Sequence, residues 1–371
     1  MKFYIVLLLF CMPFILPSQE LSGPQGGLWL DNNGVHINAH GGGMLYQNDT
    51  YYWFGEHKTD GKGGNRANVG VHCYSSKNLM DWTDEGIALK MSEDTTSLLV
   101  AGCILERPKV IYNELTKKYV MWFHHELKDQ GYDAAMTGLA ISDTPSGPYE
   151  YIRSLRPNAG IWPMNFPDSS KEIKTRLDDL ERGSEEWKAW SKEGGYLRRD
   201  FEGGQMCRDM ALFIDVDDRA YHMASSEENQ TLHIRELTDD YQDFTGKYVR
   251  VLPAGRNEGP AIFRKDGKYY MITSGLTGWK PNPGKSAMAD SIMGEWTALG
   301  NPCIGTEEEE NTTFESQSTY AIDMDGKGKR YILMADRWRP ENAIDGRYVW
   351  IQIDFDENNP ILKWENVFEG K

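Results

Sequence analysis

Five stretches of the chain share one hairpin pattern, and this repetition limits the possible folds more than any other feature. In each stretch a polar residue precedes an apolar strand, a turn rich in Asn, Asp and Gly follows, and the chain resumes with a strand led by Tyr. The clearest copy is "EGPAIFRKDGKYYMITSG", in which Asp-Gly between two such runs is a strong hairpin signal. The leading residues of the five copies are His40, Glu106, Asp209, Glu258 and Gln317.

A second half-motif follows each hairpin and adds two more strands. It consists of a strand, a polar loop and an aromatic residue that opens another strand, as in "CYSSKNLMDWTDEGIAL" and "AMADSIMGEWTALG". Four antiparallel strands repeated radially form a β-propeller, so we predict an all-β, five-bladed propeller as a single domain over residues 19–371. Solenoid repeats would be shorter and more even, and a sandwich would not produce this paired periodicity.

The second repeat is much longer than the others, which predicts an insertion over about residues 156–206. Within it, "SSKEIKTRLDDLERGSEEWKAWSKEG" has helical composition and a Ser cap signal at its start. We therefore expect a short helical insertion in the second blade, lying over one rim of the propeller.

The polar leading residues are expected to meet at the propeller axis. The first strand of each blade lines the central channel, so a residue at the head of that strand points toward the axis at one face. Three of the five are carboxylates, and like charges around one funnel should raise the pKa of at least one of them. A neutral carboxylic acid beside an ionised one is what general acid catalysis at a glycosidic oxygen requires.

Basic residues adjoin two of these carboxylates in the sequence. Arg107 follows Glu106, and Arg208 precedes Asp209. We expect each basic residue to hold its neighbour ionised. Glu258 has no such neighbour and is followed closely by the apolar segment "AIF", so it is the best candidate for the protonated acid.

Composition and charge narrow the class of partner. The formal net charge of −16 predicts repulsion from nucleic acid and from anionic membrane surfaces, which leaves a neutral substrate as the better hypothesis. Twelve Trp and nineteen Tyr suit either tightly packed β-structure or a surface on which sugar rings stack. An oligo- or polysaccharide is therefore the expected partner, and the protein is expected to act as a monomer.

The N-terminal segment "MKFYIVLLLFCMPFILPSQ" has the pattern of a secretory signal peptide. A single Lys2 precedes an apolar run that ends at Leu16 and is too short to span a bilayer. We expect a signal peptide over residues 1–18 and a periplasmic, cell-surface or secreted protein, while Cys11 leaves a lipoprotein as an alternative. The other four cysteines are widely spaced without a Cys-x-x-Cys pair, so a zinc site is not expected. Isolated buried thiols are expected, with one disulfide as the alternative.

On these motifs the chain resembles glycoside hydrolase family 43, a family of five-bladed propellers with inverting mechanisms. The resemblance rests on "AHGGGMLYQNDTYYWFGEHK", "ERPKVIYN", "RDMALFIDVDDRAY", "EGPAIF" and "SQSTY". "HGGG" together with "YYWFGE" is similar to the branch of exo-β-1,3-galactanases and related galactosidases that trim arabinogalactan side chains. The resemblance implies an exo-acting β-galactosidase. An α-L-arabinofuranosidase or β-xylosidase is the alternative within the family, and a non-catalytic sugar-binding propeller is the alternative outside enzymes.

The resemblance also implies catalytic roles. Glu258 matches the general acid, and Asp209 matches the carboxylate that tunes and positions it. The family's usual base is an aspartate in the first blade, but this chain reads "INAHGGG" there and has no carboxylate. In the galactanase branch the position of Gln317 faces the attacking water. Because an amide is a very weak base, Glu106 is the other candidate for this role, and both candidates remain open.

Substrate binding is expected from the same end of the channel. The resemblance assigns Glu56 to the sugar hydroxyls, and loop residues face the same rim, with two Trp residues that either stack on sugar or pack in the core. The expected substrate-binding residues are Glu56, His40, Gly42, Tyr132, Asn229, Thr277, Trp279 and Trp338.

No cofactor or metal is expected. Some members of the wider family hold calcium in the channel, but no run in this chain has the acidic ligand spacing of a calcium loop. The segment "EEEEN" at 307–311 is interpreted as a solvated charged loop.

Overall fold

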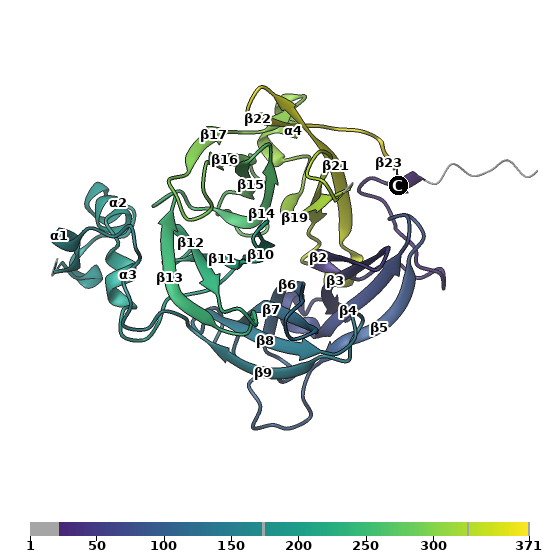
Figure 1. Ribbon diagram of the computed structural model, residues 1–371, viewed down its shortest axis with the longest axis horizontal. Coiled ribbons are helices and arrows are strands. Elements are labelled where there is room, and N and C mark those ends of the chain that lie inside the picture. The colour runs from purple at the N-terminus through teal and green to yellow at the C-terminus, as the bar shows by residue number, and fades with distance from the viewer. Residues whose placement is uncertain (1–21, 173–174, 325, 370–371) are drawn as a thin grey trace, which may run out of the picture.

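The computed structural model describes residues 22–172, 175–324 and 326–369. The predicted signal peptide over residues 1–18, with Cys11, lies outside the described residues. Five antiparallel sheets stand around a central axis, and each is one blade (Figure 1). This arrangement confirms the predicted all-β, five-bladed propeller.

Each of the first four blades is a four-stranded sheet whose strands follow one another from the axis outward. Blade one consists of β2 (His40–Gln47), β3 (Thr50–Lys58), β4 (Asn68–Ser76) and β5 (Thr83–Lys90). Blade two consists of β6 (Ile104–Asn113), β7 (Lys118–Glu126), β8 (Met136–Ser142) and β9 (Glu150–Leu155). Blade three consists of β10 (Met210–Ile214), β11 (Ala220–Ser226), β12 (Thr231–Leu237) and β13 (Phe244–Val251). Blade four consists of β14 (Glu258–Lys265), β15 (Lys268–Ser274), β16 (Lys285–Ala289) and β17 (Thr297–Gly300).

Blade five has an additional strand at its outer edge, where β18 runs parallel to β22. Its strands are β19 (Gln317–Asp323), β20 (Tyr331–Arg337), β21 (Arg347–Asp356), β22 (Asn359–Lys363) and β18 (Cys303–Ile304). Two short strands near the chain ends pair with each other, β1 (Ser22–Pro24) and β23 (Val367–Glu369). The helices are α1 (Asp168–Lys171), α2 (Glu185–Lys192), α3 (Gly195–Arg199) and α4 (Glu307–Thr312), with 3₁₀ turns η1 (Gly64–Ala67), η2 (Leu177–Asp179) and η3 (Ala343–Asp345).

The inner strands β2, β6, β10, β14 and β19 contact one another around the axis. The predicted leading residues lie at or beside the start of these strands, so five residues far apart in sequence reach one end of the channel. The Asp266–Gly267 turn joins β14 and β15 as a two-residue loop, with φ of 49° and 83°. Positive φ at both positions is what a type I′ hairpin turn requires.

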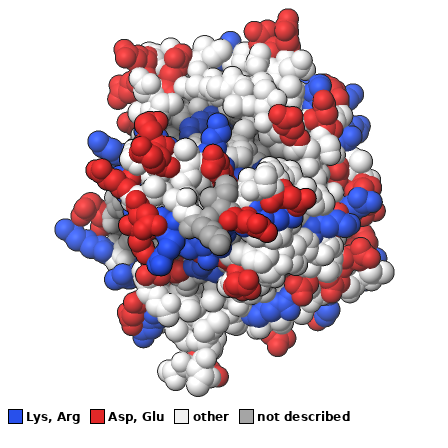
Figure 2. Space-filling view, turned by 90° about the vertical axis from the view of Figure 1, so that its left-hand side faces the viewer, with Lys and Arg blue, Asp and Glu red and all other residues white. Residues whose placement is uncertain are grey.

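The predicted insertion follows blade two, in the connection from β9 to β10, and contains α1, η2, α2 and α3. It projects from the outer edge of blade three, at the left of Figure 1. The Ser cap predicted at the start of the segment is not found there, because α1 begins after Pro167 without a side-chain cap; Ser184 instead caps α2 by accepting a hydrogen bond from the Trp187 amide at 3.1 Å. On this side of the molecule acidic and basic side chains are interspersed (Figure 2).

The "EEEEN" segment is a helix, α4, and the expectation of a loop is wrong. Thr306 accepts a hydrogen bond from the Glu309 amide, and the Glu309 carboxylate accepts one from the Thr306 amide, which together form a capping box. Four acidic side chains in the first turn face the positive end of the helix dipole. The cap and the dipole therefore explain why a run of like charges is helical here.

The four described cysteines, Cys73, Cys103, Cys207 and Cys303, are buried free thiols, as predicted. None of the helices in the described ranges is long and apolar enough to cross a membrane.

An aromatic cluster closes the ring between blades one and five. Trp29, which precedes the first blade, is buried with its ring centroid 4.5 Å from Trp350 of blade five and 5.8 Å from Trp53 of blade one. The same segment pairs with β21, since Gln25 accepts a hydrogen bond from the Trp350 amide at 2.8 Å and the Gly26 amide donates to Tyr348. The chain before the first blade thus fastens the last blade to the first.

We predict that Trp29→Ala lowers the free energy of unfolding by about 3–5 kcal/mol, because it leaves a cavity where the ring closes. Denaturant unfolding would measure the loss. Trp279→Ala is the matched control, since Trp279 is 43% exposed and its removal leaves no buried cavity. A loss at Trp29 as small as that at Trp279 would contradict this account of ring closure.

Candidate active site

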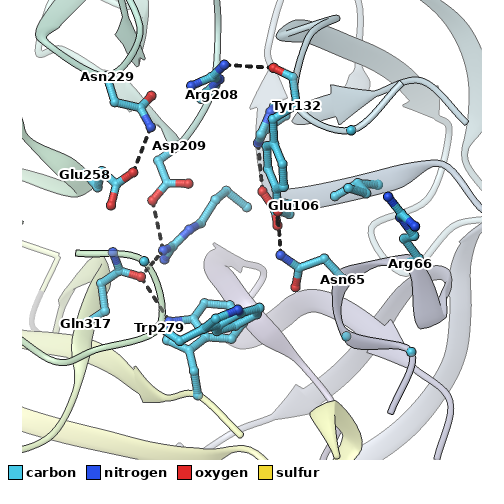
Figure 3. Close-up of a pocket in the computed structure, with 18 residues that line it drawn as sticks. Asn65, Arg66, Glu106, Tyr132, Arg208, Asp209, Asn229, Glu258, Trp279 and Gln317 are labelled. Carbon is cyan, nitrogen blue, oxygen red and sulfur yellow. Dashed lines mark hydrogen bonds and ion pairs between the residues drawn. The ribbon is translucent and has the colours of Figure 1, made fainter. Parts of the chain in front are cut away.

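A pocket of about 500 Å³ opens at the end of the channel where the inner strands begin, and all five blades contribute to it (Figure 3). Four of the five leading residues line it, the exception being His40. The predicted site residues in its wall are Glu106, Asp209, Glu258, Gln317, Tyr132, Asn229, Trp279 and Trp338.

β-bulges at the start of the inner strands turn the leading side chains into this region. In blades one, two and four the residue after the leading one is left-handed, with φ of 57° at Gly41, 55° at Arg107 and 57° at Gly259. The hairpin register shifts at the same three places. A bulge bends its strand and re-aims a side chain. Glycine adopts this conformation freely, whereas a residue with a side chain accepts a penalty of about 1–2 kcal/mol.

Each left-handed residue donates its backbone amide to a carboxylate of the preceding blade. This contact, which we call the amide–carboxylate clasp, satisfies buried polar groups on both sides and links neighbouring blades. The three clasps run from Gly41 to Asp336 Oδ2 at 2.6 Å, from Arg107 to Glu56 Oε1 at 3.0 Å and from Gly259 to Asp209 Oδ2 at 2.9 Å.

Glu258 lies in the pocket as a carboxyl group that favours its neutral form. Burial and the neighbouring negative charge of Asp209 raise its pKa to about 8, against the opposing effect of Arg107. Its Oε1 accepts a hydrogen bond from Asn229 Nδ2 at 2.8 Å. The direction of the shift agrees with the sequence prediction that like charges would keep one carboxyl group protonated.

Glu106, unlike Glu258, favours its ionised form. Burial alone would raise its pKa, but His124, Lys58 and the Tyr132 hydroxyl together lower it to about 2. Its two oxygens lie 2.9 Å from His124 Nδ1 and 2.8 Å from the Tyr132 hydroxyl. His124 also contacts Glu126 at 2.8 Å, and these two carboxylates raise the pKa of the buried imidazole to about 10 despite its desolvation. Glu106 is therefore a fixed anion.

The expected pairing of each carboxylate with its sequence neighbour is wrong. Arg107 pairs with Asp209 at 2.9 Å rather than with Glu106, and Arg208 pairs with Glu228 at 3.2 Å rather than with Asp209. Successive side chains along a strand point to opposite faces, so adjacent residues rarely meet. Arg107 finds its partner in the neighbouring blade, whereas Arg208 and Glu106 find theirs elsewhere within their own blades.

Arg107 occupies the axis and connects three blades. Its guanidinium donates to the Ser318 carbonyl at 3.1 Å and to Gln317 Oε1, pairs with Asp209, and lies 5.3 Å from the Trp338 ring centre. A buried cation at this point neutralises part of the surrounding negative charge, which is why several carboxylates can share the region.

Gln317 has its acceptor side already occupied. Its Oε1 accepts hydrogen bonds from Arg107 and from Trp338 Nε1 at 2.9 Å, and its Nε2 donates to Ser274 Oγ at 2.8 Å. An amide nitrogen has two N–H groups, so one donor remains beyond that contact.

Four expected substrate-binding residues lie outside the pocket wall. Glu56 is fully buried and pairs with Lys58 at 2.8 Å, while His40 is buried and stacks on Trp338 at 5.2 Å. A side chain at Gly42 would meet the Phe54 carbonyl at 2.5 Å, so Gly42 serves close backbone packing. Thr277 hydrogen-bonds within its own loop, to Lys280 and Asn282, and so shapes the loop that carries Trp279.

Sequence reasoning missed several residues of the site. The hairpin register places Glu56, His124, Ser274 and Asp336 directly opposite the leading residues of blades one, two, four and five. Of these four residues only Glu56 was expected; counting back across each hairpin turn would have identified the other three. The pocket-lining residues that were missed include Asn65, Arg66, Arg107, His124 and Arg208.

One cluster in the described part of the chain has the spacing of a metal site but not the chemistry. Ligand atoms of Glu106, His124 and Asp209 lie within 4.8 Å of one another. A histidine must be neutral to bind a metal, whereas His124 is held protonated between two carboxylates. Asp209 is already paired with Arg107. These residues do not fit a resident cation.

Comparison with known proteins agrees with this geometry. The model for glycosyl hydrolases family 43 matches residues 183–358. A β-D-galactofuranosidase from Aspergillus niger is 31% identical over 145 residues, and the match spans 36% of this chain and only 39% of that protein.

Solved structures extend the likeness along the chain. A family 43 β-1,3-galactosidase solved with galactodeoxynojirimycin is 47% identical, with a TM-score of 0.89 over 93% of this chain and 99% of that one. An exo-β-1,3-galactanase from Clostridium thermocellum is 31% identical, with a TM-score of 0.76 over 94% of this chain and 67% of that one. An exo-β-1,3-galactanase from Phanerochaete chrysosporium, solved with galactose, is 30% identical, with a TM-score of 0.73 over 93% and 67%.

The chain resembles nearly the whole of another chain, and its pocket raises the pKa of Glu258 while it lowers that of Glu106. Together these features define a propeller-type glycoside hydrolase. Within that class the chain belongs to glycoside hydrolase family 43.

We predict that His124 stays doubly protonated from about pH 6 to about pH 9, whereas an ordinary histidine titrates near 6.5. The raised pKa of about 10 follows from its two carboxylate contacts. Nitrogen-15 NMR of the imidazole nitrogens would measure this. His40 is the internal contrast, because burial lowers its pKa to about 3 and keeps it neutral over the same range. Titration of His124 near pH 6.5 would contradict the assignment of Glu106 as a fixed anion.

Proposed function

We propose that this protein is an inverting, exo-acting β-galactosidase that releases terminal galactose from β-1,3-linked galactan, including arabinogalactan side chains. The observation that carries the proposal is Glu258, a half-buried carboxyl group in the axial pocket whose pKa is raised to about 8 by desolvation and by the neighbouring charge of Asp209. The substrate class follows the β-1,3-galactosidase activity of the relative that is 47% identical. We also propose that the protein is exported and works as a monomer, the export resting on the N-terminal apolar segment.

In the proposed reaction Glu258 donates its proton to the glycosidic oxygen as the bond to the anomeric carbon breaks. Asp209 maintains the high pKa of Glu258 through its negative charge and holds the strand beside it through the Gly259 clasp. A water molecule attacks the anomeric carbon from the opposite side and gives up a proton. Inversion of the anomeric configuration follows from this single displacement.

Gln317 and Glu106 are the two groups proposed to handle that water. Because the Gln317 oxygen already accepts two hydrogen bonds, its remaining N–H group is suited to holding the water by donation. Glu106 is ionised and retains free lone pairs beside its contacts with His124 and Tyr132, so it can accept the proton, although its lowered pKa of about 2 makes it a weak base. Transfer through the imidic tautomer of Gln317 is the other route.

The remaining pocket residues are suited to holding the sugar. Trp279 is 43% exposed and meets Trp338 edge-on at 5.7 Å, so its open face offers a stacking platform. Trp338 instead donates to Gln317 and packs on His40 and Arg107, which makes it part of the pocket's support. Tyr132, linked to Asn65 at 2.6 Å, is placed to contact hydroxyl groups.

Product analysis tests this function. Mature protein would be supplied with β-1,3-galactan oligosaccharides, aryl β-galactoside, α-arabinofuranoside, β-xyloside and β-galactofuranoside, while NMR follows the anomer as it forms. We expect galactose of inverted configuration from the galactan oligosaccharides and loss of that turnover in Glu258→Gln. Release of arabinose, xylose or galactofuranose instead would replace the substrate, and sugar binding without any turnover would favour a lectin.

The pH dependence gives a second test. Activity requires protonated Glu258, so kcat/KM is expected to fall as pH rises through about 8. Asp209→Asn removes the adjacent negative charge, lowers the pKa of Glu258 and should move this alkaline limb to lower pH. Asp243→Asn is the control and should leave the limb in place, because it removes an exposed ion pair with Arg153 while its amide oxygen can still accept from the Phe244 amide. If Asp209→Asn leaves the alkaline limb at the same pH, Asp209 does not raise the pKa of Glu258.

A further inference from the structure

The turn that carries Asn229 has an unusual backbone. Residues 227–230, here called the Asn229 turn, join β11 to β12, and three consecutive non-glycine residues are left-handed, with φ of 53° at Glu227, 56° at Glu228 and 60° at Asn229. Such residues persist only where the surrounding structure holds them. The contacts of the two glutamates therefore matter to the position of Asn229.

Glu227 is anchored in the interior of blade three. It is fully buried, and its Oε1 lies 2.8 Å from His233 Nε2 and 2.7 Å from Arg250 Nε. Arg250 also donates to its Oε2 at 2.8 Å, so the arginine binds both oxygens. A bidentate arginine fixes the direction of a carboxylate as well as its place.

The helical insertion holds Arg250 in turn. The guanidinium donates to the carbonyls of Ser191 and Lys192 in the last turn of α2, at 3.4 and 3.2 Å. Asn165 hydrogen-bonds both the amide and the carbonyl of Arg250, at 3.0 and 2.8 Å. The insertion therefore hydrogen-bonds both the side chain and the backbone of Arg250.

Glu228 is attached to the insertion by a second route. Its carboxylate accepts hydrogen bonds from Arg199 of α3 at 2.9 Å and from Arg208 at 3.2 Å. Each glutamate of the turn is therefore held by one arginine that contacts the insertion, Arg250, or belongs to it, Arg199.

Within the site, Asn229 at the tip of this turn donates a hydrogen bond to Glu258 Oε1 at 2.8 Å, as Figure 3 shows. A donor on Oε1 leaves the other oxygen of the neutral carboxyl group to carry the acidic proton. The direction of Asn229 therefore decides which way the proton points.

We propose that the insertion is a positioning element for the acid: through Arg250 and Glu227 it holds the Asn229 turn, which aims the carboxyl group of Glu258 at the leaving oxygen. This inference rests on the proposed role of Glu258. Glu227 and Arg250 are positioning residues, since neither lines the pocket.

The test compares two leaving groups, because only a poor one needs a well-aimed acid. Rates would be measured on β-1,3-galactobiose and on 2,4-dinitrophenyl β-galactoside. Glu227→Gln should lower kcat on galactobiose on the order of 10- to 100-fold, as misplaced catalytic groups do. It should lower kcat on the activated aryl galactoside by no more than about threefold. Adding Glu227→Gln to Asn229→Ala should cause no further loss, because both act through one contact.

Glu236→Gln is the matched control. Glu236 lies on the same strand β12, is nearly as buried, and pairs with Lys247 of β13 at 2.9 Å, away from the Asn229 turn. It should leave both rates unchanged. Arg250→Lys keeps the charge but loses the bidentate contact, and it replaces Glu227→Gln if circular dichroism shows that variant unfolded.

The possible outcomes test the positioning role of the insertion separately from the proposed role of Glu258 as the general acid. Glu258→Gln must itself lose galactobiose turnover selectively. If it lowers both rates equally, Glu258 is not the acid and the proposed function fails. If Glu258→Gln is selective while Glu227→Gln and Arg250→Lys leave both rates unchanged or lower both equally, the positioning role alone is overturned.

Discussion

Burial of charge on the propeller axis is the constraint on which the rest of the site depends. An uncompensated ion in the interior costs several kcal/mol, so each charged group here needs a partner. Arg107 supplies the central cation, and the amide–carboxylate clasps give the surrounding carboxylates backbone donors. Placing this cation requires a strained, left-handed backbone at Arg107. The contacts of its guanidinium with Asp209, Gln317 and Ser318 offset that strain.

Two glutamates in the same pocket behave as opposite reagents because their neighbours differ. Both are desolvated, yet Glu106 faces a protonated histidine while Glu258 faces another carboxylate. Environment rather than residue type therefore separates the permanent anion from the proton donor. The same logic explains why His124 is charged and His40 is neutral, although both are buried.

The hairpin repeat made the fold and the ring of leading residues predictable from sequence, because strand period and turn chemistry are local properties. The pairing of charges was not predictable in the same way: Arg107 meets Asp209 across a blade boundary, and no local pattern encodes that contact. Side chains at His40 and Glu56 also lie beneath the pocket rather than in its wall, since burial depends on packing from several blades. The α4 helix was missed because a charge run was weighed without its Thr306 cap.

The shared hairpin also has a consequence for how such a site changes over evolution. Each blade presents one residue at an equivalent register position, and the clasps are made by backbone amides rather than by the reactive side chains. Exchange of His40, Glu106 or Glu258 therefore leaves the strand, its bulge and its clasp to the preceding blade intact, whereas exchange of Asp209 changes the acceptor of the Gly259 clasp. The leading side chain of one blade can therefore change, and with it the chemistry of the pocket, while the backbone of that blade stays the same.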